Sequence, residues 1–155
     1  MSVKKTNKKQ KRSKYNVSLE DKLTYNNIKF RSKLEVNHYK YFLEHPNIEV
    51  VEFEPYFLLL EPFKYFDWCK GKERSYGKLS YKADFTLKIK GVDKLVIVEC
   101  KGMVTQAFQL REKLWYNQYG NDYYYMRSSS LKYCKEVLSK YESRYAWPIM
   151  VEECI

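Results

Sequence analysis

The sequence predicts an α/β protein in which a mixed central β-sheet is flanked by helices. Segments with alternating apolar residues are interspersed with segments in which apolar residues recur every three or four positions. Their order is β, α, β, β, β, β, α, β, α, and interleaved strands and helices pack as layers. The chain has 155 residues, of which 45% are hydrophobic and 17% aromatic, which is typical of one folded domain.

A short strand and a helix are expected first. The Asn-Asn pair at 26–27 is typical of a turn, and it leads into a short alternating segment that ends at Phe30. Ser32 then provides a helix N-cap, with Glu35 at the spacing of a capping box. The helix is expected to end before Pro46.

Strands are expected next. Residues 48–53 and 56–60 favour β-structure, and the second run is closed by Pro62. Residues 67–77 carry charges and two glycines, which predicts the loop of a long hairpin. Residues 79–89 alternate cleanly and predict one strand. Its apolar face has Tyr81, Ala83, Phe85, Leu87 and Ile89, and its polar face has Lys82, Asp84, Thr86 and Lys88.

The remaining elements form a second strand and helix pattern. Residues 94–101 are apolar on both faces until the last three, as expected for a central buried strand. Thr105 is a candidate N-cap for a helix at 106–119. An aromatic strand is expected at 123–126, followed by a final helix at 131–145 and an extended end.

Positive charge is concentrated at the N-terminus. The chain has 29 basic and 19 acidic residues, and seven of its ten net charges lie in residues 1–14, which contain no acid. We therefore expect residues 1–14 to be a disordered basic arm and residues 15–155 to be a single domain. Such an arm favours nucleic acid through counterion release. A solubility tail and an arm for anionic lipid are the alternatives. Its cations are Lys4, Lys5, Lys8, Lys9, Lys11, Arg12 and Lys14.

The cysteines and the hydropathy predict a cytoplasmic protein without a membrane span. Cys69, Cys100, Cys134 and Cys154 form no C-x-x-C pair or zinc spacing, and no secretory segment precedes them, so we expect reduced thiols. No run approaches the ~18 apolar residues that a membrane span requires.

A candidate catalytic cluster lies on the strands at 79–89 and 94–101. Residues two apart on a strand share a face, so Glu99 and Lys101 point one way and Cys100 the other. If the strands form a hairpin in register, Asp84 joins Glu99 and Lys101. Two carboxylates can bind a hard divalent cation, with the lysine beside it to meet an anion. The alternatives are pairing of Asp84 with a lysine and a strand-end ion pair between Glu99 and Lys101.

Glu35 is a further candidate. It lies on one stripe of its helix with His38, Tyr39 and Phe42, so its carboxylate is expected to face the protein, where it needs a metal or a lysine. The alternative is that Glu35 serves the capping box alone.

Three motifs occur in order: S-K-x-E at 32–35, Y-x-A-D-F at 81–85 and V-E-C-K-G at 98–102. Together they resemble the PD-(D/E)XK nucleases, and more closely a small, mostly phage-borne branch related to Holliday-junction resolvases and the transposon end-cutting nuclease. T-x-x-F-x-L-x-x-K-L at 105–114 also fits this branch. Ala83 stands where the superfamily has its name-giving proline, which many members lack.

The resemblance implies a restriction-endonuclease-like core and an Mg²⁺ (or Mn²⁺) ion held by Asp84 and Glu99, with the backbone carbonyl of Cys100. It implies catalytic roles for Glu35, Asp84, Glu99 and Lys101. Lys101 would orient the attacking water or stabilise transition-state charge, and Glu35 would hold a metal-bound water or a second ion.

The implied function is Mg-dependent endodeoxyribonuclease activity on phosphodiester bonds of branched or structured DNA, as in a Holliday-junction resolvase, during recombination or replication. The location would be the cytoplasm, or the host cytoplasm if the chain is phage-encoded. Symmetrical cutting of two strands would suggest a homodimer. Arg111 and Lys113 are candidate phosphate contacts, with an exposed helix face as the alternative. The rival functions are a catalytically inactive DNA-binding module that uses the basic arm, and an interaction protein whose arm docks on an acidic partner.

Overall fold

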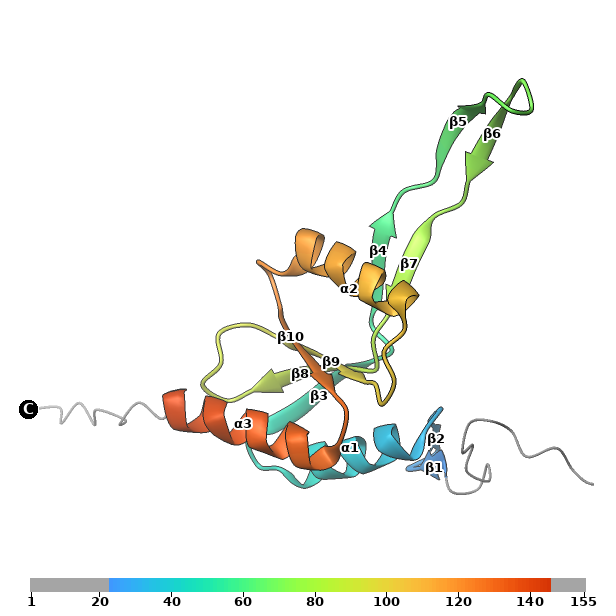
Figure 1. Cartoon of the computed structure of the whole chain (residues 1–155). Helices are drawn as coiled ribbons and strands as arrows, with labels where there is room; N and C mark the ends of the chain where they lie inside the picture. Colours follow the sequence, from blue (N-terminus) through green and yellow to red (C-terminus); the bar gives the residue numbers. More distant parts are fainter. Residues whose placement is uncertain (1–22, 146–155) are drawn as a thin grey trace, which may run out of the picture.

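The computed structural model describes residues 23–145 (Figure 1), so the expected basic arm and the expected extended end lie outside the described residues. The helices are α1 (Lys33–Glu44), α2 (Gln106–Tyr119) and α3 (Leu131–Tyr145). The strands are β1 (Thr24–Tyr25), β2 (Ile28–Lys29), β3 (Ile48–Phe53), β4 (Tyr56–Leu60), β5 (Phe63–Asp67), β6 (Lys72–Tyr76), β7 (Leu79–Lys82), β8 (Phe85–Ile89), β9 (Val96–Cys100) and β10 (Tyr124–Ser128).

The central sheet has four strands in the order β10-β9-β8-β3. β8 is antiparallel to β3 and β9, whereas β9 and β10 are parallel and are connected through α2. This confirms the prediction of an α/β fold with a mixed sheet and flanking helices.

The sheet separates two hydrophobic clusters. α1 and α3 cover one face and α2 lies on the other side (Figure 1). The first cluster joins α1 and α3 to β8, β9 and β10, and includes Phe42, Phe85 and Val98. The second joins α2 to β4 and β7 and is centred on Trp115, whose side chain is fully buried. β9 is buried on both faces, because Val98 contributes to the first cluster and Ile97 to the second.

The caps and turns at the N-terminal end form as expected. Asn26 and Asn27 both have positive φ, 50° and 61°, as a two-residue hairpin turn requires, and they connect β1 to β2. Ser32 is the N-cap of α1, and its hydroxyl accepts a hydrogen bond from the N–H of Glu35. Thr105 caps α2 in the same way through Phe108.

The single strand predicted at 79–89 is wrong, since the chain forms β7 and β8 with a break at Ala83–Asp84. β7 pairs with β4, whereas β8 pairs with β3 and β9. The alternation continues through the break, but Tyr81 and Ala83 belong to the second cluster and Phe85 to the first. An alternating pattern records burial and not the partner strand, so it does not reveal this change of sheet. Asp84 therefore lies at the junction of two sheets.

The hairpin predicted around 67–77 is present, but its loop is shorter than predicted, because Lys72–Tyr76 form strand β6. β5 and β6 are antiparallel and are joined by a turn at 68–71, and they extend away from the body (Figure 1). Every residue of β6 is exposed, so the sequence carries no apolar alternation there. The pairing is supported by aromatic contacts across the strands, with Tyr65 stacked on Tyr76 at 5.1 Å between ring centroids.

Within residues 23–145, no helix combines the length and apolarity that crossing a membrane requires. In the same part of the chain, Cys69 is exposed, Cys100 and Cys134 are buried, and none of the three forms a disulfide.

Candidate active site

Glu35, Asp84, Glu99 and Lys101 line one cavity of about 620 Å³. They come from three places: the first turn of α1, the junction between β7 and β8, and the end of β9. The pairing of β8 with β9 brings Asp84 beside Glu99, because Phe85 lies opposite Val98 and the N–H of Asp84 donates to the Val98 carbonyl at 3.0 Å. The convergence predicted from the hairpin is therefore present.

Asp84 is held rigidly. Its Oδ2 atom accepts a hydrogen bond of 2.6 Å from the backbone N–H of Cys100, which ties the junction to the end of β9. Burial, and next the negative charge of Glu99, raise the pKa of Asp84 to about 7. The Cys100 N–H opposes this rise, and Glu35 adds to it. Near neutral pH this carboxyl is therefore balanced between its charged and neutral forms.

Glu99 is buried at the end of β9. Its Oε2 atom accepts a hydrogen bond of 2.8 Å from the hydroxyl of Tyr81, which lies 2.9 Å from the hydroxyl of Tyr125. Burial raises the pKa of Glu99, although the Tyr81 bond and the Lys101 charge oppose the rise. The two tyrosines thus position a carboxylate whose charged form is disfavoured by burial.

Lys101 follows β9 directly and is half-exposed. Its Nζ atom lies 3.9 Å from Oε1 of Glu99, so the strand-end ion pair considered as an alternative does occur. The ammonium also lies 5.2 Å from the centre of the Phe108 ring. Because the ion pair is long and the side chain reaches solvent, the ammonium is accessible to an anion in the cavity.

Glu35 completes the cap of α1, and it also lines the cavity. The hydroxyl of Ser32 donates to its Oε1 at 2.9 Å, and the backbone N–H of Arg31 donates to its Oε2 at 3.0 Å. The donor to Oε2 thus comes from the residue before the N-cap, one position earlier than in an ordinary capping box. These bonds fix a buried carboxylate against the cavity and close to Asp84.

Besides the hydroxyls of Tyr81 and Tyr125, sequence reasoning missed three groups that support the site. Glu54, in the turn between β3 and β4, has a left-handed φ of 49°, and its N–H donates to the Asp84 carbonyl at 3.0 Å. Its carboxylate pairs with Lys82 at 3.5 Å and with the guanidinium of Arg31, and both cations line the cavity. Backbone in this region is strained for a non-glycine residue and often accompanies functional sites. The only sequence feature that could have indicated one of these three groups is the position of Arg31 directly before the S-K-x-E motif.

The carboxylates are too few to supply every ligand of a metal ion, but they suit Mg²⁺, which keeps several water ligands. Among the described residues, no group of three or more His, Cys, Asp or Glu side chains is arranged to hold a metal. Mg²⁺, however, commonly uses one or two carboxylates together with waters and substrate phosphates. Asp84 and Glu99 provide hard oxygen donors in a water-accessible cavity, so the donor set fits such an ion.

The Cys100 side chain does not belong to this donor set. Its thiol lies in the first hydrophobic cluster, and burial raises its pKa, which keeps it protonated. The N–H of Cys100 points toward Asp84, and the N–H and C=O of one strand residue point to the same edge. The backbone of Cys100, and not its thiol, therefore faces the site, and its carbonyl is the oxygen that could act as a metal ligand.

Arg111 and Lys113 are exposed on α2 and do not line this cavity. The seven cations of the expected arm lie outside the described residues. Arg111 and Lys113 are thus not among the groups that the fold gathers around the carboxylates.

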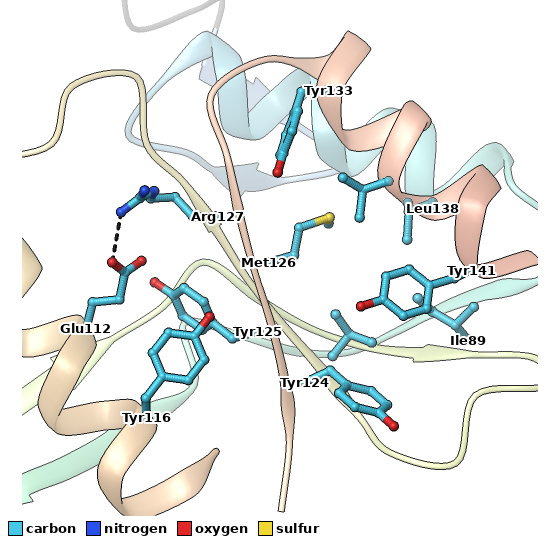
Figure 2. A pocket seen from close by; sticks show the side chains of 12 residues that line it. Ile89, Glu112, Tyr116, Tyr124, Tyr125, Met126, Arg127, Tyr133, Leu138 and Tyr141 are labelled. Carbon is cyan, nitrogen blue, oxygen red and sulfur yellow. Dashed lines mark hydrogen bonds and ion pairs between the residues drawn. The ribbon is translucent and has the colours of Figure 1, made fainter. Parts of the chain in front are cut away.

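A second cavity, of about 350 Å³, lies along β10 between α2 and α3 (Figure 2). It contains none of the four predicted catalytic residues. Tyr116, Tyr124, Tyr125, Tyr133 and Tyr141 line it, beside an ion pair of 2.8 Å between Arg127 and Glu112. Tyr125, which lines this second cavity, is connected to Glu99 by hydrogen bonds through Tyr81. A residue of β10 thus helps to position Glu99 in the candidate site.

The fold and the cavity define an α/β protein with a site of acidic residues and a lysine at the end of a central hairpin. Residues 12–135 match the family described as "Protein of unknown function (DUF1064)", and the chain belongs to that family. No curated protein and no solved structure matches the chain.

Proposed function

We propose that this chain is a divalent-metal-dependent endodeoxyribonuclease of the PD-(D/E)XK type. The observation that carries the proposal is the half-buried carboxylate of Asp84 next to the buried carboxylate of Glu99, with Lys101 beside them in one open cavity. None of the three is needed to fill the hydrophobic core, and burial raises the pKa of both acids. Perturbed acids in a cleft are typical of functional sites.

A bound cation would offset the unfavourable burial of these acids. Asp84, Glu99 and, through its backbone carbonyl, Cys100 would hold Mg²⁺ or Mn²⁺, and Glu35 would hold a water of that ion or a second ion. When bound, the metal supplies a water of lowered pKa and offsets charge on the phosphoryl oxygens.

The protein groups perform the remaining steps. The Lys101 ammonium is positioned to orient the attacking water or to stabilise the charge that develops on the phosphoryl oxygens. The Cys100 N–H holds Asp84 and the Tyr81 hydroxyl holds Glu99, so both carboxylates are pre-organised. Arg31 and Lys82 line the same cavity and attract the phosphate backbone.

Branched or structured DNA is the substrate we propose, with a role in recombination or replication. The seven cations of residues 1–14 provide a general attraction to DNA. A cytoplasmic location, or the host cytoplasm for a phage-encoded chain, and a homodimer that cuts two strands complete the proposal.

The test is cleavage of labelled four-way junction, flap, single-stranded and blunt duplex DNA with Mg²⁺, Mn²⁺ or EDTA. We expect cutting by the parent and by Asp122→Asn, a control on the exposed turn after α2, and none by Asp84→Asn. Salt-sensitive binding without cutting of any DNA would instead favour the DNA-binding module.

A further inference from the structure

The β5–β6 hairpin has no evident role in the fold. It extends away from the body (Figure 1), and its side chains contribute to neither hydrophobic cluster. A strand rises roughly 3.3 Å per residue, so the eight residues that follow Leu60, up to Trp68, set the tip on the order of 25 Å beyond the end of β4. An arm of this length is expected to contact a binding partner outside the chain.

The tip of this arm presents a tryptophan to solvent. Trp68 is 87% exposed, the highest value among the exposed large hydrophobic side chains. The turn beneath it is ordered, because the N–H of Lys70 donates to both the carbonyl and Oδ1 of Asp67, and the N–H of Gly71 donates to the Trp68 carbonyl. A large ring held out on a rigid turn is suited to stacking on a flat partner.

One face of the arm combines rings with cations. The register places Phe63, Tyr65 and Tyr76 on the same face as Lys72 and Arg74. Phe63 lies 5.5 Å from Tyr76 and Tyr65 lies 5.1 Å from Tyr76, so the rings form a continuous row.

The charge of the arm favours an anionic partner. Residues 63–76 contain four cations and two acids, a net charge of +2. Glu73 pairs with Lys64 at 3.1 Å and Asp67 with Arg74 at 3.1 Å. Neither acid of the arm is thus left for Lys70 or Lys72, which are exposed beside Trp68. Exposed rings interleaved with cations are the pattern by which proteins hold unpaired nucleic-acid strands.

We propose that the β5–β6 arm binds unpaired bases of branched DNA, with Trp68 stacked on a base and Lys70 and Lys72 on the adjoining phosphates. Bases inside a duplex are already stacked, so an exposed tryptophan gains most from bases at a fork or junction. The inference rests on the proposed function for its choice of DNA, and it names the substrate feature that the arm selects.

The test measures binding of the full chain in EDTA, so that cutting plays no part. Fluorescence anisotropy compares a forked duplex with unpaired ends against a blunt duplex, for the parent, Trp68→Ala and Trp68→Phe. Base stacking on an aromatic ring predicts that Trp68→Ala weakens binding to the fork about 5- to 100-fold, while the blunt duplex changes less than about twofold. Trp68→Phe keeps a ring and should retain most of the affinity.

The cations are tested separately. Lys70→Ala combined with Lys72→Ala should reduce the dependence of log Kd on log salt by about 1.5 on the fork, because two phosphate contacts are lost. Lys88→Ala with Lys90→Ala removes the same charge from an exposed site off the arm and should leave the fork preference unchanged.

Three results would overturn the inference. One is equal affinity of the parent and Trp68→Ala for the fork. Another is a loss of affinity in Trp68→Ala that is equal for the fork and for the blunt duplex. The third is a parent that sediments as a dimer and a Trp68→Ala variant that sediments as a monomer with unchanged DNA binding, which would make the arm a contact between copies. If the parent binds forks through Trp68 but never cuts with Mg²⁺, the nuclease proposal fails and the arm's role stands.

Discussion

Asp84→Asn should stabilise the metal-free protein at alkaline pH while removing its metal binding. The pKa of Asp84 is raised from 3.8 to about 7 in the folded protein, so its ionised form is less favourable there than in the unfolded chain. One pKa unit corresponds to about 1.4 kcal/mol, which sets an upper limit of about 4 kcal/mol. The site is open to water, so we expect about 2 kcal/mol. Asn keeps an oxygen that can accept the Cys100 N–H.

The sign of the pH dependence follows from the raised pKa. The stability that Asp84 provides in its protonated form is fully present below pH 3.8 and is lost as pH rises through about 7. The advantage of Asp84→Asn over the parent should therefore be largest above pH 7 and should shrink toward pH 4. Enzymes often trade stability for activity at such acids.

Urea unfolding followed by circular dichroism, at pH 8.5 and pH 4.5 in EDTA, measures this difference. Asp122→Asn should show no comparable gain. Adding Mg²⁺ or Mn²⁺ at pH 8.5 should stabilise the parent, by about 1.4 kcal/mol at ten times the dissociation constant, and should leave Asp84→Asn unchanged. If Asp84→Asn is no more stable than the parent at pH 8.5, or if the parent gains nothing from either metal, the reasoning about this site is refuted.

Three further predictions concern the end of β9, Tyr81 and His38. Glu99→Gln should abolish metal-dependent cutting with the fold intact, and Lys101→Ala should lower the cutting rate about 10²- to 10³-fold. Tyr81→Phe should weaken metal binding about 10- to 100-fold, measured by titration calorimetry, because Glu99 loses the donor that orients it. Removing that donor also raises the Glu99 pKa, so the acid limb of the activity profile should move to higher pH. Burial lowers the pKa of His38, so the contribution of this residue to the free energy of unfolding should fall as pH drops below 6.5, and the stability of the parent relative to His38→Leu should decline over that range.

Each of these has a distinct contrary result. Cutting by Glu99→Gln at the parental rate would remove that residue from the site. An unchanged pH profile in Tyr81→Phe would show that the tyrosine fills space and does not position the acid. Equal acid sensitivity of the parent and His38→Leu would place the titrating group elsewhere.

Most elements and the meeting of the acids could be predicted because their signals are local. Ser32 and Thr105 carry their capping chemistry in their own side chains, and the pairing of β8 with β9 follows from two adjacent strands joined by a short turn. Given that pairing, the period of two in a strand is sufficient to place Asp84 beside Glu99 and Lys101.

The remaining features depend on long-range partners. The change of sheet at Ala83–Asp84 is set by which strand pairs with β7, and the alternating pattern is the same for either partner. Tyr81 reaches Glu99 because the chain bends at this junction, and Tyr125 joins them from a strand 44 residues later. β6 could not be predicted because all its side chains are exposed, so its sequence has no alternation of apolar and polar residues.

The most direct test of the central claim is single-turnover cutting of a four-way junction by excess protein, with Mg²⁺ or EDTA, for the parent and Glu99→Gln. The account predicts cutting by the parent with Mg²⁺ alone and none by Glu99→Gln, although both bind the junction. Cutting that persists in EDTA, or that Glu99→Gln retains, would contradict the assignment of a metal-dependent nuclease site to Asp84, Glu99 and Lys101.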